Sequence, residues 1–124
     1  MIRAVATRVV NLRRDAYDVY IGRAGRGLNG YFGNPYPVGE RCSRCSLRHD
    51  TPVSTLPCFT AYFHERIGAD AEFRARVLAL DGLALGCFCA PNRCHGDVYA
   101  TFLNRPRELI DAHIAQLIAA VLRM

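Results

Sequence analysis

The stretch Leu85-Gly86-Cys87-Phe88-Cys89-Ala90-Pro91-Asn92-Arg93-Cys94-His95-Gly96-Asp97 decides the fold, because it joins an apolar run to an amphipathic one. On a strand, successive side chains point to opposite faces, so Cys87 and Cys89 share one face. Pro91 ends the strand, and a helix begins near Cys94. The apolar stripe of that helix is Val98, Tyr99, Phe102 and Leu103. A strand, a turn and a helix are therefore predicted around three cysteines and a histidine.

Three interpretations of this cluster remain open. In the first, the cluster binds zinc, with an iron–sulfur cluster less favoured, although adjacent residues such as Cys94 and His95 rarely ligate one ion comfortably. In the second, Cys94 is a nucleophile made thiolate by the helix N-terminus, with His95 or Asp97 handling the proton. In the third, the cysteines are ordinary buried residues. Their position at a strand-to-helix turn favours a site. The full candidate metal set is Cys87, Cys89, Cys94 and His95.

The C-x-C-x-P-x-x-C-H-G-D string resembles a family of small bacterial and phage proteins known as domain of unknown function 4326. Two further strings carry the resemblance, Tyr17-Asp18-Val19-Tyr20-Ile21-Gly22-Arg23 and Gly33-Asn34-Pro35-Tyr36, and together they span most of residues 9 to 103. The resemblance implies a compact α/β unit whose shared motifs meet at one site. It implies no activity, so function is argued from the residues.

Length and composition favour a single domain over residues 1–124, because 124 residues that are 51% hydrophobic suffice for one core. The apolar stretches are broken before membrane-spanning length, and the N-terminus does not read as a signal peptide. We therefore expect a cytoplasmic protein of a bacterial cell or a phage-infected host, with no membrane partner. Six cysteines in such a chain are expected to be reduced, and either metal-bound or catalytic.

All sixteen basic residues are arginine, and this excludes several function classes. A Walker-A phosphate loop, a Schiff-base mechanism and a pyridoxal phosphate anchor each need a lysine. The formal charge of +5 permits attraction to phosphates but does not by itself indicate a nucleic-acid partner.

The segment from Gly22 to Gly39 holds six glycines among arginines and aromatic residues. Glycine lets backbone approach a ligand closely, arginine matches phosphate, and aromatic faces stack on bases. We therefore predict a site for a nucleotide, nucleoside or nucleic-acid base. The alternative is a surface loop whose aromatic residues pack on the core. The candidate ligand-binding residues are Arg23, Arg26, Asn34 and Arg93.

A second cysteine cluster occupies a loop at about residues 40–58. Cys42 and Cys45 form a C-x2-C pair, His49 follows four residues later, and Cys58 lies beyond. These are the ligand types of a structural tetrahedral zinc site. Cys58 is the least secure member, because it can instead be a buried cysteine at the start of a helix, and His49 can be a solvated loop histidine.

The predicted fold is α/β or α+β, a compact two-layer domain with a small sheet, a central strand at about 83–89 and at least four helices. Residues 2–10 and 17–21 read as strands that can pair as a hairpin. The last helix has an apolar stripe wide enough for the core or for a homodimer contact. His64 and His113 flank apolar stripes and read as boundary histidines.

Two functions follow from these features. The first is a zinc-binding α/β protein that acts on or binds a nucleotide, nucleoside or nucleic-acid base, with Cys94, His95 and Asp97 nearest the chemistry. The alternative is a non-catalytic, zinc-stabilised module that binds nucleic acid or protein. In that alternative every cysteine is structural.

Overall fold

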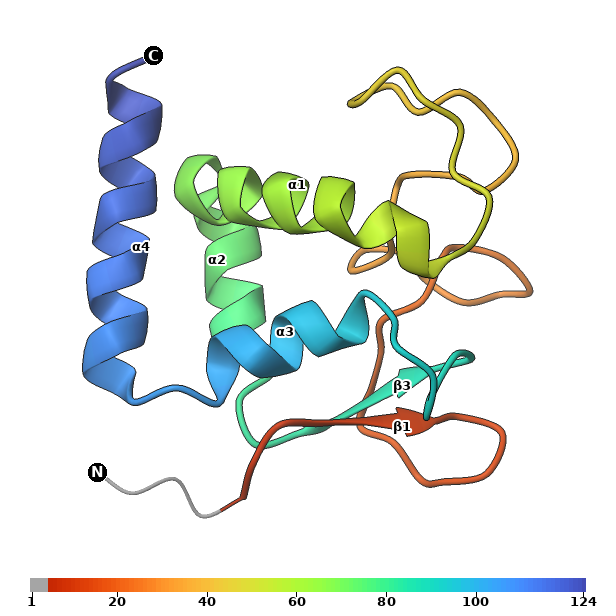
Figure 1. Cartoon of the computed structure of the whole chain (residues 1–124). Coiled ribbons are helices and arrows are strands. Elements are labelled where there is room, and N and C mark those ends of the chain that lie inside the picture. The colour runs from red at the N-terminus through yellow and green to blue at the C-terminus, as the bar shows by residue number, and fades with distance from the viewer. Residues whose placement is uncertain (1–4) are drawn as a thin grey trace.

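The chain folds into a small sheet with its α-helices stacked on one side (Figure 1). The computed structural model describes residues 5–124. Within that range the predicted mixed architecture, with a small sheet and four α-helices, is confirmed. The elements follow in the order β1 (Arg8–Asn11), β2 (Val19–Tyr20), the 3-10 helix η1 (Val53–Thr55), α1 (Leu56–Ala69), α2 (Ala71–Leu78), β3 (Ala84–Cys87), α3 (Gly96–Leu103) and α4 (Arg107–Leu122).

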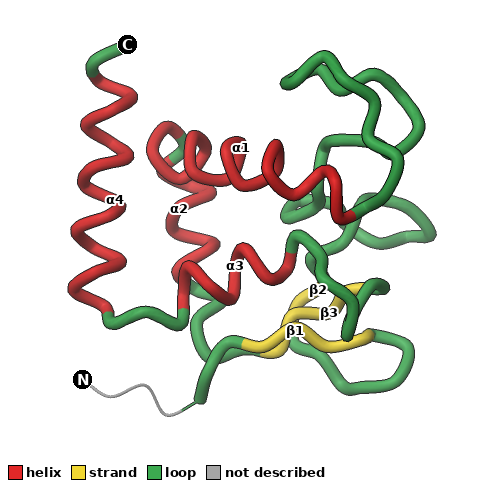
Figure 2. Tube along the Cα trace, in the orientation of Figure 1, coloured by secondary structure: helices red, strands yellow, loops and turns green. Residues whose placement is uncertain are grey.

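The central strand of the sheet is β3, as predicted (Figure 2). The strand order is β1-β3-β2, and both pairings are parallel, so that Val9 and Val19 each lie opposite Leu85. All four residues of β3 are buried, which is typical of a parallel strand covered on both faces. The strand ends at Cys87, two residues before the predicted end. There the chain turns, with the Asn92 N–H donating to the carbonyl oxygen of Cys89 at 2.8 Å.

The predicted hairpin between residues 2–10 and 17–21 is wrong in the part that the structure describes. β1 and β2 both run parallel to β3 and lie on its opposite edges. Alternation of apolar residues shows which face of a strand is buried, but it does not show which strand it pairs with. β3, which is buried on both faces, has two free edges, and one strand pairs along each of them. The Tyr17 ring covers Gly86, where a Cβ atom would lie 2.7 Å from Tyr17 Cγ. Residues 1–4, which include the predicted start of the first strand, lie outside the described range.

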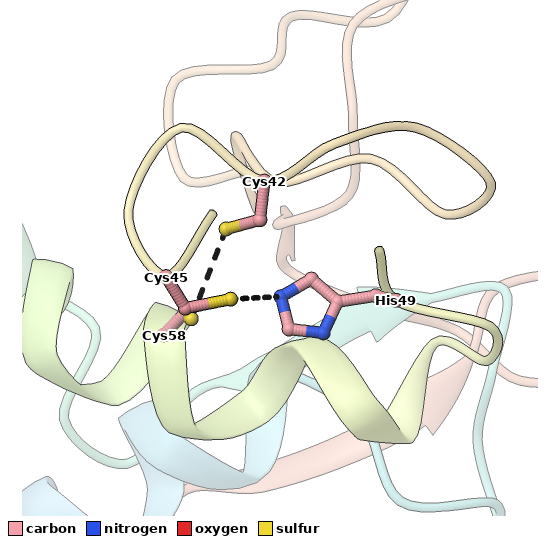
Figure 3. A group of neighbouring side chains, drawn as sticks. All are labelled: Cys42, Cys45, His49 and Cys58. Atoms are coloured by element: carbon pink, nitrogen blue, oxygen red, sulfur yellow. Dashed lines mark hydrogen bonds between the residues drawn. The ribbon is translucent and has the colours of Figure 1, made fainter. Parts of the chain in front are cut away.

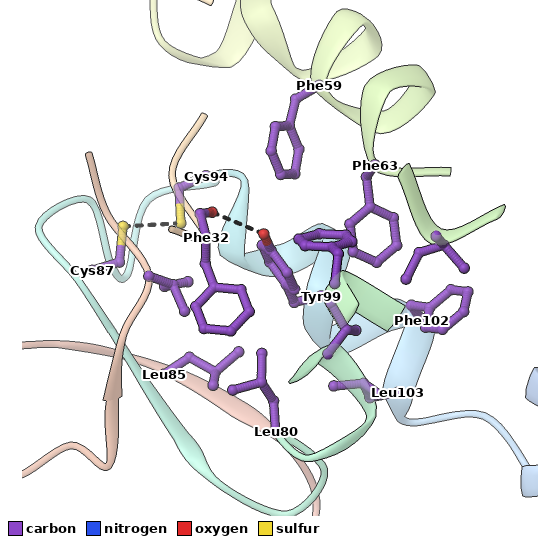
Figure 4. Packing of buried hydrophobic residues seen from close by; sticks show 14 of the residues in the cluster. Phe32, Phe59, Phe63, Leu80, Leu85, Cys87, Cys94, Tyr99, Phe102 and Leu103 are labelled. Atoms are coloured by element: carbon purple, nitrogen blue, oxygen red, sulfur yellow. Dashed lines mark hydrogen bonds between the residues drawn. The ribbon is translucent and has the colours of Figure 1, made fainter. Parts of the chain in front are cut away.

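Two glycines allow close packing, one between a helix and the sheet and one between two helices. A Cβ atom at Gly96, the first residue of α3, would lie 2.7 Å from Ile21 Cδ1 and 3.0 Å from Val9 Cγ1, so glycine lets α3 pack closely on these side chains. A Cβ atom at Gly68 of α1 would lie 2.5 Å from the carbonyl oxygen of Leu117 in α4. The core between these elements combines aromatic rings with aliphatic and cysteine side chains (Figure 4). Its most deeply buried rings are Phe59, Phe63, Phe73 and Tyr99.

The last helix, α4, directs its apolar stripe mainly into the core. Ile110 and Ile114 are buried, whereas Leu109 and Leu122 are 56% and 79% exposed. A homodimer through these exposed side chains stays a prediction. None of the helices within residues 5–124 has the length and apolar character needed to cross a membrane.

Candidate functional site

The cysteine loop, residues 40–58, gathers the four predicted metal ligands (Figure 3). The ligand atoms of Cys42, Cys45, His49 and Cys58 all lie within 4.8 Å of one another. Cys58 therefore joins the group, although its position in the sequence made it the least secure member. We call these four residues the loop group. They can hold a metal ion.

Local hydrogen bonds shape the loop group. The Cys42 N–H donates to the carbonyl oxygen of Leu47 at 2.7 Å, and the Ser46 N–H donates to that of Cys42 at 2.9 Å. These bonds close a tight turn that presents Cys42 to the first turn of α1, where Cys58 lies. The two sulfur atoms are 3.8 Å apart. Two thiolates bound to one tetrahedral zinc ion at about 2.3 Å lie roughly 3.8 Å apart, so the spacing suits such an ion.

The thiols of the loop group differ in proton affinity. Burial acts to raise the pKa of Cys42, but the N–H groups of Cys45 and Arg44, together with hydrogen bonds to the His49 and Cys45 side chains, outweigh it and lower the pKa from 9.0 to about 6. Burial, with hydrogen bonds to the neighbouring thiols, raises the pKa of Cys58 to about 11. At neutral pH the group thus already holds one thiolate, the form that binds metal.

A second group, Cys87, Cys94 and His95, lies where β3 ends and α3 begins; we call it the central group. Its ligand atoms also lie within 4.8 Å of one another, and the two sulfur atoms are 3.4 Å apart (Figure 4). All three side chains are buried. The sequence motif therefore does converge on one place, and this group too can hold a metal ion.

The protonation pattern of the central group differs from the predicted one. The hydrogen bond between the Cys87 and Cys94 thiols is the main reason why the pKa of Cys87 is lowered from 9.0 to about 6. The same bond, together with burial, raises the pKa of Cys94. These two directions favour a thiolate on Cys87, whereas the helix-dipole argument predicted one on Cys94. Burial lowers the pKa of His95, so its ring is neutral near pH 7.

Two residues that the sequence assigned to this site, Cys89 and Asp97, lie next to the central group but are not members of it. Cys89 follows the end of β3, and its N–H points to the sulfur of Cys87 at 3.4 Å. The Asp97 carboxylate accepts the N–H of Cys94 at 3.1 Å and so closes the first turn of α3. Asp97 therefore positions the backbone of Cys94, and its role in proton transfer stays a prediction.

A cavity of about 530 Å³ opens beside the central group. Most of its wall comes from the glycine–arginine segment (residues 22–39), the end of β3 and the start of α3, and Tyr20 of β2 and Pro52 of the cysteine loop complete it. All members of the central group reach its wall, and two aromatic rings, Tyr20 and Phe88, meet edge to face there with centroids 6.1 Å apart. The wall includes Gly22, Arg23, Arg26, Cys87, Cys94 and His95.

The predicted ligand-binding residues of the glycine–arginine segment divide into two kinds. Arg23 donates to the carbonyl oxygens of Asn34 and Tyr36, the second at 2.6 Å. The Asn34 side chain donates to Thr55 Oγ1 at 2.8 Å and accepts the Tyr36 N–H at 2.9 Å. Both side chains therefore hold the segment in shape. Arg26 is exposed and makes no hydrogen bond or ion pair with any residue in the described range, so its guanidinium group is available to a ligand.

A smaller cavity of about 350 Å³ lies on the other side of Cys94. Arg93 and Asp97 line it, so these two predicted site residues face away from the larger cavity. His64 of α1 and His113 of α4 also line it, with ring centroids 5.1 Å apart. The sequence marked both histidines only as boundary residues, because their proximity depends on how two distant helices pack.

This chain is similar to known proteins over all of the residues that form the two metal-ligand groups and the larger cavity. The family model described as "Domain of unknown function (DUF4326)" matches residues 6–105. An uncharacterised 12.4 kDa protein from the nrdA-td intergenic region of Enterobacteria phage T4 is 33% identical over 98 residues, which cover 79% of this chain and 78% of that protein. No solved structure matches. Both metal-ligand groups lie within the range that the family model matches.

Proposed function

The chain belongs to the family described as domain of unknown function 4326, and on that premise we propose that it is a zinc-binding protein acting on a nucleotide, nucleoside or nucleic-acid base. The ligand is held in the cavity of about 530 Å³ beside Cys94 and His95. One observation carries the proposal: the glycine–arginine segment and the central group, which are separate in the sequence, form the walls of the same cavity.

The walls of this cavity match the chemistry of such a ligand. Its volume lies within the range of roughly 300–1,000 Å³ that is typical of small-molecule sites. Phe88, which is 38% exposed, and Tyr20 offer aromatic faces on which a base can stack. Arg26 offers a guanidinium group, which pairs well with phosphate. The cavity thus offers aromatic contacts for the base of a nucleotide and a guanidinium group for its phosphate.

Zinc is the metal that best suits the loop group. Three sulfur ligands and one imidazole nitrogen are a common donor set of structural zinc sites. An iron–sulfur cluster is less favoured, because it is usually held by four cysteines. In this proposal the loop zinc fixes the cysteine loop against α1 and so stabilises one side of the domain.

The proposed reaction takes place at Cys94 and His95, which line the cavity. Asp97 positions Cys94 by accepting a hydrogen bond from its backbone N–H. Nucleotides, nucleosides and nucleic acids are present in the cytoplasm of a bacterial cell, including one infected by a phage. We therefore place the protein there.

A panel of nucleobases, nucleosides and nucleotides tests the proposal by thermal shift and calorimetric titration of the zinc-loaded protein. At least one compound is expected to stabilise the wild type, and Arg26→Ala is expected to weaken the phosphorylated members most. Arg123→Ala is the matched control, because Arg123 is exposed at the end of α4, far along the chain from the cavity. If no compound binds, or if both variants respond as the wild type does, the proposal is wrong.

A second candidate function is a non-catalytic, zinc-stabilised module that binds nucleic acid. The formal charge of +5 and the four-ligand loop group favour it. Such a module would bind single-stranded or double-stranded oligonucleotides with strong salt dependence and would ignore mononucleotides. The same titrations, extended to oligonucleotides at two salt concentrations, therefore separate the two functions.

A further inference from the structure

The two metal-ligand groups of this chain differ in the number of donors that they provide. The loop group offers four side chains, whereas the central group offers three. Structural zinc sites are usually closed by four protein ligands, and catalytic sites usually provide three and leave one position for water or substrate. The two groups therefore correspond to two kinds of zinc site.

His95 is held in the way that is typical of a metal-binding histidine. Its Nε2 atom lies at hydrogen-bonding distance from the carbonyl oxygen of Ile21. A carbonyl oxygen only accepts, so in the neutral ring Nε2 carries the hydrogen and Nδ1 keeps the lone pair. Histidine ligands commonly donate their second ring N–H to a backbone carbonyl, which fixes the tautomer and the ring orientation. The nitrogen left for a metal is therefore Nδ1.

The spacing and the charge of the central group also suit zinc. The sulfur atoms of Cys87 and Cys94 are 3.4 Å apart, a few tenths of an ångström closer than the roughly 3.8 Å expected for two thiolates on one zinc ion. A small outward movement of either side chain would accommodate the ion. Metal binding displaces the proton that remains on the thiol pair, and the two thiolates then neutralise the divalent cation, so the nearby guanidinium of Arg23 does not oppose its binding. Two sulfurs and one nitrogen disfavour magnesium and calcium, which prefer oxygen.

The fourth coordination position would face the larger cavity. Cys87, Cys94 and His95 all line that cavity, and no fourth histidine, cysteine or carboxylate within residues 5–124 brings a ligand atom within 4.8 Å of all three. Cys89 is the nearest competitor, since it too lines the cavity and its N–H contacts Cys87. A site closed by Cys89 would be structural, and a site left open would be reactive.

We propose that Cys87, Cys94 and His95 bind a second zinc ion whose fourth position opens into the cavity of about 530 Å³. This position takes an exchangeable water molecule or a nitrogen or oxygen atom of the bound ligand. The proposal rests on the proposed function for the identity of that ligand, but not for the metal itself. It assigns Cys94 as a metal ligand, in place of a nucleophile.

Metal content of the full chain tests the first half of this proposal. The wild type, purified without chelator in the presence of zinc, is expected to hold two zinc ions per chain. Cys87→Ser and Cys45→Ser are each expected to hold one, because they disable different sites. Cys89→Ser is the matched control and is expected to keep both ions. A wild type that holds one zinc ion, or a Cys89→Ser variant that loses one, overturns the proposal.

Cobalt substitution tests the second half, and its first readout, the response to azide, uses the wild type alone. Cobalt absorption responds to the number of thiolates and to added ligands. We expect azide to change the spectrum of one of the two bound cobalt ions, and Cys89→Ser to leave the spectrum unchanged. A spectrum that azide does not alter, or one that weakens in Cys89→Ser, shows a closed site and contradicts the proposal. Neither measurement uses a nucleotide, so failure of the nucleotide panel and failure of the metal site remain distinguishable.

Discussion

Replacing Asn34 with alanine is expected to destabilise the protein by roughly 2–4 kcal/mol. Asn34 is buried, and its side chain accepts the Tyr36 N–H at 2.9 Å and donates to Thr55 Oγ1 at 2.8 Å. Alanine leaves the buried N–H of Tyr36 without a partner, which costs about 1–3 kcal/mol, and it removes the bond to Thr55, which costs about 1 kcal/mol more. Asn34 thus shapes the cavity wall through its neighbours, and its predicted contact with a ligand stays a prediction.

The chain supplies a matched control in Asn29. Its side chain accepts the N–H of Tyr31 at 2.8 Å, the same spacing of two residues, but Asn29 is exposed. Asn29→Ala is therefore expected to change stability by no more than about 0.5 kcal/mol. Urea unfolding of both variants at the same zinc concentration measures the difference as a shift in midpoint at unchanged slope. The reasoning is refuted if Asn34→Ala costs no more than Asn29→Ala.

Three further predictions concern other parts of the molecule. Tyr99→Phe removes the hydrogen bond from the Tyr99 hydroxyl to the carbonyl oxygen of Phe32, 2.8 Å long, and is expected to cost about 1–3 kcal/mol in urea unfolding. A chelator is expected to speed hydrogen exchange in residues 40–58 before it affects α4, and simultaneous loss of protection everywhere would contradict a local structural role for the loop zinc. The N–H of Phe73 lowers the pKa of Asp70 from its ordinary value of 3.8, so the contribution of Asp70 is present above that value and lost as the pH falls through the lowered pKa. The difference in melting temperature between wild type and Asp70→Ala should therefore shrink in strong acid, and a difference that stays constant argues against the cap.

Local patterns in the sequence were sufficient for three members of the loop group and for the central strand, whereas Cys58 joins the group only because α1 packs against the loop. The C-x2-C spacing and the histidine four residues later place three ligands on one turn, whose shape depends on hydrogen bonds within residues 42–47. The apolar run before Cys87 predicts a buried strand, because only a covered strand can be apolar on both faces. Both predictions rested on residues that are close together in the sequence. The structure contains both the turn that carries the ligands and the buried strand.

Features that depend on distant neighbours were not predictable in the same way. Whether β1 pairs with β2 or with β3 depends on which edge is free, and alternation carries no such information. Arg23 is a plausible phosphate ligand by residue type, but the fold places two carbonyl oxygens within reach of its guanidinium group. Asp97 follows Cys94 closely in sequence, yet the helix turns its carboxylate toward the smaller cavity. Residue type thus identified candidates, and packing decided their roles.

NMR of the cadmium-substituted protein during titration with the nucleotide panel observes the metal and the cavity together, and so tests whether the second metal site and the ligand site are one. The account predicts two cadmium resonances, one from the loop group and one from the central group. Only the second is expected to shift when a compound enters the cavity of about 530 Å³, since only that metal lies in its wall. A single resonance, or two resonances that no member of the panel moves, would contradict the claim.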